Sequence, residues 1–164
     1  MLDLAAGGGR HARLLRARGF PVTAADRDTA ALKAQFAGDA GVEIVTIDLE
    51  DGGPWRLGQG FDGIVVANYF HRPLFPALVA ALATGGAVIY ETFMLGNERF
   101  GRPSNPDFLL KPGELLAAFA ALTIVAFEQG IVDQPRPAAI QRIAAVKAKE
   151  APLPGWIIPP PPAS

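Results

Sequence analysis

The chain has 164 residues, of which half are hydrophobic and 19% are charged, and its formal net charge is −1. This composition predicts one domain with an apolar core, and it gives no basic excess that would point to a nucleic-acid partner. The absence of cysteine excludes disulfides, thiolate metal sites and cysteine nucleophiles, and it fits a reducing, cytoplasmic location.

The sequence also gives no sign of a membrane partner. Its apolar runs are shorter than the roughly 20 residues that a membrane-spanning helix needs. The first residues do not form a signal peptide, because Asp3 interrupts their short apolar stretch.

Strands and helices are predicted to alternate through the first half of the chain. Leu74, Leu78 and Leu82 share one helical face, and the glycine pair 85–86 is expected to end that helix. The predicted strands are 2–5, 21–25, 42–47, 61–67 and 87–92; the predicted helices are 10–18, 29–36 and 73–83, and residues 50–60 form a glycine-rich loop.

The second half follows a different pattern. Residues 93–111 are expected to form a long loop, and a helix is expected from Pro112 to about Ala121. Two further strands, 123–129 and 139–148, are joined by a hairpin turn at 133–137, which predicts an antiparallel pair. The proline-rich residues 151–164 predict an extended tail, so the domain is assigned to residues 1–150.

These elements predict an α/β fold with a Rossmann-like sheet of seven strands. The sheet is expected to be mostly parallel with a terminal antiparallel pair, and to carry helices on both faces. Ligands of such sheets bind at the carboxyl ends of the strands. The groups that follow those ends are therefore expected to cluster: the glycine turn 7–9, Asp26, Asp48 and Asn68.

The glycine turn predicts a small-molecule site. Gly7-x-Gly9-x-x-Ala12 fits the loose dinucleotide pattern, and Asp26 stands near the place of an acid that grips ribose hydroxyls. Asp3, however, lies within a strand that is normally apolar in dinucleotide sites. A buried carboxylate needs a partner, which a cationic amino group provides and a pyrophosphate does not. The pattern therefore favours a zwitterionic amino-acid ligand over a diphosphate.

With this motif the sequence resembles the class I S-adenosylmethionine-dependent methyltransferases, from Leu2 to Lys147. Their first motif, an acid followed by a glycine-rich turn, stands here at residues 3–9, with Ala5 in place of the usual glycine. The run 7–11, Gly-Gly-Gly-Arg-His, is similar to the small-molecule methyltransferases of the tellurite-resistance type. Compared with the family, the chain is interpreted as lacking the usual N-terminal helix.

The resemblance implies S-adenosylmethionine as cofactor and a small molecule as methyl acceptor, with neither nucleic acid nor membrane as a partner. It implies that Asp26 holds the ribose hydroxyls, that Asp48 approaches the adenine amino group with Leu49 against the ring, and that Asn68 lines the methionine end. The predicted cofactor-binding residues are Asp3, Ala5, Gly7, Gly9, Asp26, Arg27, Asp48, Leu49 and Asn68.

Methyl transfer from a sulfonium depends chiefly on alignment and on the exclusion of water, and it needs a base only when the nucleophile must lose a proton. His71 and Glu91, which follow or end predicted strands, are the candidate catalytic residues. Each also has a structural interpretation: His71 as a half-exposed loop residue, and Glu91 as a member of an ion pair. Arg99 and Arg102 are candidates for an anionic substrate or for solvated loop residues. No group of residues has metal-ligand spacing, so no metal is predicted.

Two other functions stay open. An NAD-dependent oxidoreductase fits the glycine pattern, although Asp3 and the lack of a Tyr/Lys catalytic set count against it. A non-catalytic, methyltransferase-like partner module fits the short N-terminus and the apolar composition. The identity of the acceptor and the oligomeric state are left open.

Overall fold

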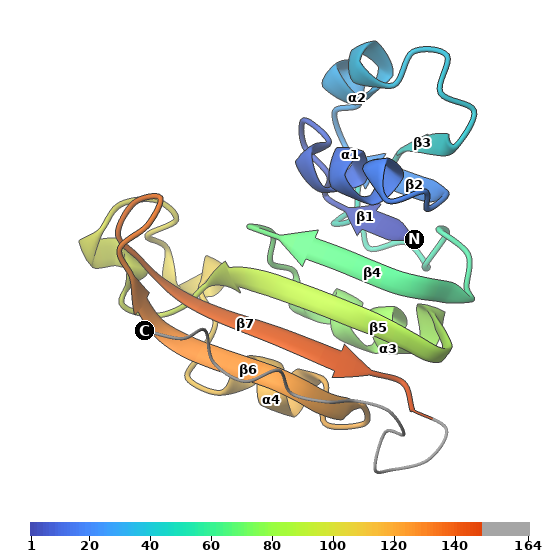
Figure 1. Cartoon of the computed structure of the whole chain (residues 1–164). Coiled ribbons are helices and arrows are strands. Elements are labelled where there is room, and N and C mark those ends of the chain that lie inside the picture. Colours follow the sequence, from blue (N-terminus) through green and yellow to red (C-terminus); the bar gives the residue numbers. More distant parts are fainter. Residues whose placement is uncertain (149–164) are drawn as a thin grey trace, which may run out of the picture.

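The computed structural model describes residues 1–148, and the predicted tail 151–164 lies outside the described residues. Seven strands form one sheet in the order β3-β2-β1-β4-β5-β7-β6 (Figure 1). The first five strands run parallel, and β7 runs antiparallel to both of its neighbours, β5 and β6. The predicted seven-stranded sheet with its terminal antiparallel pair is confirmed.

Within residues 1–148 no helix is long and apolar enough to span a membrane. The strands are β1 (Leu2–Leu4), β2 (Val22–Asp26), β3 (Val42–Thr46), β4 (Phe61–Ala67), β5 (Leu82–Phe93), β6 (Thr123–Val132) and β7 (Ala138–Val146). The helices are α1 (Arg10–Ala17), α2 (Ala30–Gln35), α3 (Phe75–Ala81) and α4 (Glu114–Ala118), with three short 3₁₀ helices, η1 (Arg72–Leu74), η2 (Asn97–Arg99) and η3 (Pro106–Phe108).

Two apolar clusters lie on opposite faces of the sheet. Successive side chains of a strand point to opposite faces, and along β2 Ala24 belongs to the smaller cluster while Ala25 belongs to the larger one. Ala12 of α1 and Leu32 of α2 pack in the smaller cluster, whereas Leu78 of α3 packs in the larger cluster together with α4. Helices therefore cover both faces, as predicted, and Figure 1 shows α3 and α4 behind the sheet.

The predicted boundary between the third helix and the fifth strand is wrong. Helix α3 ends at Ala81, and β5 begins at the next residue, upstream of the glycine pair 85–86. Leu82 pairs with Phe61 at the start of β4. A Cβ atom on Gly86 would lie 2.6 Å from the carbonyl oxygen of Phe61. This glycine therefore permits a close backbone approach inside a strand instead of ending a helix.

The segment after β5 also differs from its prediction. Residues 93–111 contain η2 and η3, and the helix expected from Pro112 to about Ala121 is reduced to α4. Gly113 precedes α4 with a left-handed φ of 71°. The chain thus turns at this glycine, and the helix begins after it rather than at the proline.

Aromatic side chains fill the larger cluster below the carboxyl ends of β4 and β5. The rings of Phe75, Tyr90 and Phe119 lie with their centroids 5.7–5.9 Å apart. The hydroxyl of Tyr90 donates a hydrogen bond of 2.9 Å to the carbonyl oxygen of Tyr69. The core therefore fixes the segment that leaves β4, where part of the predicted site lies.

Candidate functional site

Asp3 is held inside the protein by helix α1. Leu2 and Leu4 pack in the larger cluster, so the side chain between them points to the opposite face. Its Oδ2 accepts a hydrogen bond of 2.8 Å from the backbone N–H of Ala12, and its Oδ1 lies 3.9 Å from Nδ1 of His11. Burial raises the pKa of Asp3 to about 6. The protein itself thus supplies a partner for this buried carboxylate, and a role in cofactor binding stays a prediction.

Two residues with left-handed backbone follow neighbouring strands. Ala5, after β1, has a φ of 53°, and Asn68, after β4, has a φ of 56°. Residues other than glycine seldom adopt this region, and such strain concentrates at functional sites. The chain leaves both central strands abruptly, which opens space at their carboxyl ends.

Asp26 ties the glycine turn to the end of β2. Its Oδ2 accepts a hydrogen bond of 2.7 Å from the N–H of Gly7, and its Oδ1 accepts one of 3.0 Å from the N–H of Asp28. Gly9 has a packing role, because a Cβ atom there would lie 2.8 Å from the side chain of Leu32. Both predicted glycines therefore contribute to the shape of the turn.

A cavity of about 270 Å³ opens beside this turn, at the carboxyl ends of β1, β2, β3 and β4. We call it the aspartate cavity. Three carboxylates and one guanidinium line it, so its charge is negative. Its lining consists of the predicted residues Ala5, Asp26, Arg27, Asp48 and Leu49, together with Ile47, Glu50 and Tyr69.

Sequence reasoning gave no cofactor role to Ile47 or Glu50, and it considered Tyr69, with Phe70, only as an aromatic wall near the sulfonium or as core packing. The signal that was available is their position, since each lies within two residues of a predicted residue at a strand end. The hydroxyl of Tyr69 is buried and has no hydrogen-bond partner within residues 1–148. Burial and the nearby carboxylates of Glu50 and Asp48 raise its pKa, so the hydroxyl keeps its proton at neutral pH. A buried donor therefore lines the cavity.

The structure does not bring the two predicted catalytic residues together. His71 lines a hollow of about 150 Å³ with Trp55, and this hollow shares Asp48 and Leu49 with the aspartate cavity. Glu91 lies on β5, where it lines a different cavity. The catalytic roles of His71 and Glu91 stay predictions.

Glu91 belongs to a row of charges across three strands. It stands opposite Arg142 of β7, which stands opposite Glu128 of β6. Nη1 of Arg142 lies 3.6 Å from a carboxylate oxygen of Glu91, and its Nε lies 2.7 Å from one of Glu128. The structural interpretation of Glu91 as a member of an ion pair is confirmed.

The cavity beside Glu91 has a volume of about 370 Å³, and we call it the arginine pocket. It lies between the carboxyl ends of β4 and β5 and the hairpin of β6 and β7, and it contains the predicted residue Asn68. Its lining comprises Arg10, Asn68, Glu91, Phe93, Val132, Gln134, Pro135, Arg136, Ala138, Ile140 and Arg142.

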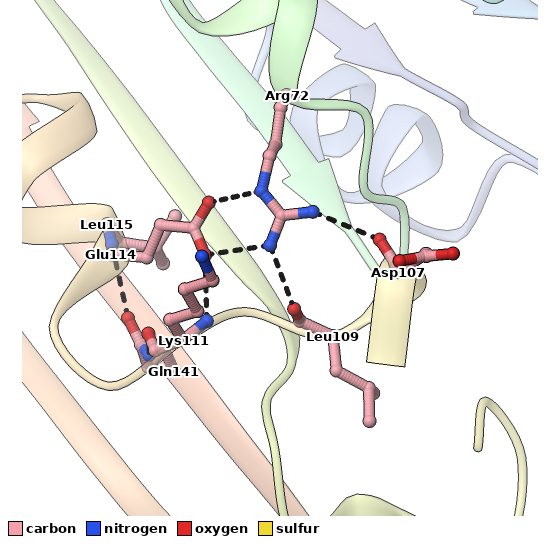
Figure 2. Close-up of polar contacts among 7 residues, drawn as sticks. All are labelled: Arg72, Asp107, Leu109, Lys111, Glu114, Leu115 and Gln141. Atoms are coloured by element: carbon pink, nitrogen blue, oxygen red, sulfur yellow. Dashed lines mark hydrogen bonds and ion pairs between the residues drawn. The ribbon is translucent and has the colours of Figure 1, made fainter. Parts of the chain in front are cut away.

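Arg72, next to the candidate His71, has a structural role that the sequence did not indicate. Its guanidinium donates two hydrogen bonds to the carboxylate of Glu114, of 2.6 and 3.0 Å, and one of 3.1 Å to each carbonyl oxygen of Asp107 and Leu109 (Figure 2). Burial opposes ionisation of Glu114, but Arg72 and the N–H of Lys111 outweigh it and lower the pKa of this carboxyl. The network fastens the segment after β5 to the end of β4.

Solved structures of several methyltransferases superpose on this seven-stranded fold. The fold is that of the class I methyltransferases. TehB from Haemophilus influenzae superposes with a TM-score of 0.74 at 15% identity, over 89% of this chain. The N-methyltransferase NodS from Bradyrhizobium japonicum WM9 gives a TM-score of 0.69 at 18% identity, over 90% of this chain and 85% of NodS.

A third similar structure is the 1,6-didemethyltoxoflavin-N1-methyltransferase of Burkholderia thailandensis, solved with bound S-adenosylhomocysteine. Its TM-score is 0.67 at 18% identity, over 90% of this chain and 70% of that enzyme. The chain spans only 57% of the length of TehB. No family model and no curated protein sequence matches the chain. At these identities the comparisons establish the fold that the sequence predicted.

Proposed function

We propose that the chain binds S-adenosylmethionine in the aspartate cavity and transfers its methyl group to a small molecule. The observation that carries this proposal is the charge and shape of that cavity on a methyltransferase fold. The cavity is lined by three carboxylates, those of Asp26, Asp48 and Glu50, and by a single guanidinium, that of Arg27. Such a cavity repels a diphosphate and accepts hydroxyl and amino groups, which need hydrogen-bond acceptors.

The residues present fit an adenosyl group. Asp26 and Asp48 supply carboxylate acceptors for ribose hydroxyls and an adenine amino group, and Ile47 and Leu49 provide apolar contacts for a flat ring. The hydroxyl of Tyr69 supplies one hydrogen-bond donor in the cavity, within reach of the Glu50 carboxylate and of a bound polar ligand.

When bound, S-adenosylmethionine supplies an electrophilic methyl group on its sulfonium. The chain contributes by orienting the acceptor in line with that group and by excluding water. Asn68 adjoins Tyr69 of the aspartate cavity and lines the arginine pocket, so it stands between the two spaces. Glu91 and His71 are proposed to receive a proton from an acceptor that must lose one.

Calorimetric titration with S-adenosylhomocysteine tests the proposal. The full chain is expected to bind it, and Asp26→Ala is expected to weaken binding by about tenfold or more, because a charge-assisted hydrogen bond contributes about 1.5–3 kcal/mol. Asp26→Asn keeps one acceptor oxygen for Gly7 and shows whether loss of binding reflects loss of the turn. Asp62→Ala removes an exposed carboxylate at the opposite end of β4 and serves as the charge-matched control. Absence of binding by the folded wild-type chain contradicts the proposal.

The same titration separates the two alternatives. An NAD-dependent oxidoreductase binds NADH in preference to S-adenosylhomocysteine, a result that the negative charge of the aspartate cavity opposes. A partner module with the same fold binds the cofactor analogue but shows no methyl transfer to any acceptor.

A further inference from the structure

The arginine pocket carries positive charge that the described residues do not balance. Arg10, Arg136 and Arg142 line it, and Glu91 is the only carboxylate in its lining. Arg142 is already paired, with Glu91 at 3.6 Å and Glu128 at 2.7 Å. Neither Arg10 nor Arg136 forms an ion pair with any of residues 1–148. Two guanidinium groups therefore line the pocket without an ion-pair partner, although Arg10 is close enough to Asp3 to act on the pKa of that carboxyl.

These two arginines come from distant parts of the chain. Arg10 opens α1 directly after the glycine turn, and its Nη2 lies 3.2 Å from Nε2 of His11. Arg136 lies in the turn between β6 and β7. Two like charges beside one hollow repel each other, and an anion bound between them attracts both, which more than offsets that repulsion. Guanidinium groups also match the planar oxygens of carboxylates and phosphates through paired hydrogen bonds.

The rest of the pocket is largely apolar. Phe93 and Ile140 come from β5 and β7, Val132 ends β6, and Pro135 lies in the hairpin turn. The volume of about 370 Å³ is within the range of small-molecule sites. A ligand that fits these walls has an apolar body and an oxyanion at one end.

The position of the pocket connects it with the proposed reaction. Arg10 follows the glycine turn, and Asn68 is the neighbour of Tyr69 in the aspartate cavity. A molecule in the arginine pocket therefore lies next to the proposed cofactor site. We propose that the methyl acceptor is a small organic acid whose carboxylate or phosphate is bound by Arg10 and Arg136. This inference rests on the proposed function.

The test uses three probes of similar size on the full chain: benzoate, phenyl phosphate and benzamide, each titrated by calorimetry with and without S-adenosylhomocysteine. At least one anion is expected to bind. Benzamide is the neutral counterpart of benzoate, and its affinity is expected to be lower by about tenfold or more. The stronger of the two anions distinguishes a carboxylate ligand from a phosphate ligand.

Substitutions assign the binding to the pocket. Arg136→Gln is expected to weaken anion binding about tenfold or more while S-adenosylhomocysteine binding stays unchanged, and Arg136→Lys is expected to lose less because it keeps the charge. Arg18→Gln is the matched control, since Arg18 is exposed at the end of α1 and lies outside the pocket. Arg99→Gln separately tests the expectation from the sequence that Arg99 binds an anion.

Three results overturn the inference: no binding of either anion, equal binding of benzamide and benzoate, or undiminished anion binding by Arg136→Gln. The cofactor titration keeps the two proposals apart. A chain that binds S-adenosylhomocysteine but neither anion loses only this inference. A chain that binds an anion through Arg136 but not S-adenosylhomocysteine loses the methyltransferase assignment and keeps the anion site.

Discussion

The carboxylate of Asp3, in the middle of β1, accepts a hydrogen bond of 2.8 Å from the backbone N–H of Ala12 in the first turn of α1. Asp3 is only 1% exposed. The contact joins strand and helix across the glycine turn, so the turn is held at both sides by carboxylates, Asp3 below it and Asp26 beside it. This geometry predicts how the protein responds to pH.

Asp3 should make the folded state less stable as pH rises from 4 to 7. Burial raises its pKa from 3.8 to about 6, so the folded state binds the proton more tightly than the unfolded chain does. The contribution of Asp3 to the free energy of unfolding therefore decreases through this window, by roughly 3 kcal/mol at most. Asp3→Asn keeps an oxygen for Ala12 and removes the charge.

Urea unfolding at pH 4, 5, 6 and 7 measures this effect as the difference between the wild-type chain and Asp3→Asn. The stability of the wild type relative to the variant is expected to fall as pH rises. Asp133→Asn, in the exposed hairpin turn, should show no such trend. Parallel pH profiles for wild type and Asp3→Asn would falsify the prediction.

Arg72 should be needed for stability. Arg72→Ala removes four hydrogen bonds and leaves the carboxylate of Glu114, which is only 18% exposed, without its ion-pair partner. We expect the free energy of unfolding, measured by chemical denaturation, to fall by about 2–4 kcal/mol. Arg72→Lys should lose less, because lysine keeps the positive charge, but it should still lose some stability because it cannot form the paired hydrogen bonds. Arg56→Ala, which breaks an exposed pair with Asp51, should cost much less, because solvent screens that pair. Equal losses for Arg72→Ala and Arg56→Ala contradict this assignment.

Ala5→Gly should stabilise the fold slightly. Ala5 has a left-handed φ of 53°, which costs about 1–2 kcal/mol for a residue with a Cβ atom. Glycine removes that strain but adds about 0.4–1 kcal/mol of unfolded-state entropy, so the expected net gain is up to about 1 kcal/mol. Ala6→Gly, at the buried neighbour without a positive φ, should lose about 1 kcal/mol. Thermal unfolding of both variants checks this, and a gain for Ala6→Gly alone counts against strain at Ala5.

Gly86→Ala should destabilise the pairing of β4 with β5. The added Cβ atom would lie 2.6 Å from the carbonyl oxygen of Phe61, and backbone on that side leaves little freedom to adjust. The expected loss is about 2 kcal/mol, typical of overpacking. Gly8→Ala, where no atom lies within 4 Å of the new Cβ and φ is not positive, should change stability by less than about 1 kcal/mol. If urea denaturation gives both variants the stability of the wild type, the close approach does not constrain the strand.

Local patterns in the sequence were sufficient to predict the sheet and one side of the site. Alternating apolar strands and amphipathic helices determine a mostly parallel sheet, and the residues that follow its strands must meet at one edge. For this reason Ala5, Asp26, Arg27, Asp48 and Leu49 were predicted together and line one cavity. The length of β5 was not predictable. In its local sequence Gly86 is typical of a residue that ends a helix, and only its close approach to β4 explains why this glycine lies in a strand.

Contacts between distant residues were decided only by the tertiary structure. Asp3 was correctly expected to need a partner, but the backbone N–H that binds it comes from the packing of α1 against β1. Arg72 resembles any loop arginine until the fold brings Glu114 to it. Arg10 and Arg136 likewise share a pocket only because the β6–β7 hairpin returns to the glycine turn. The periodicity of apolar residues determines which residues are buried and which ones follow the carboxyl ends of the strands. Long-range packing determines which charged side chains come into contact.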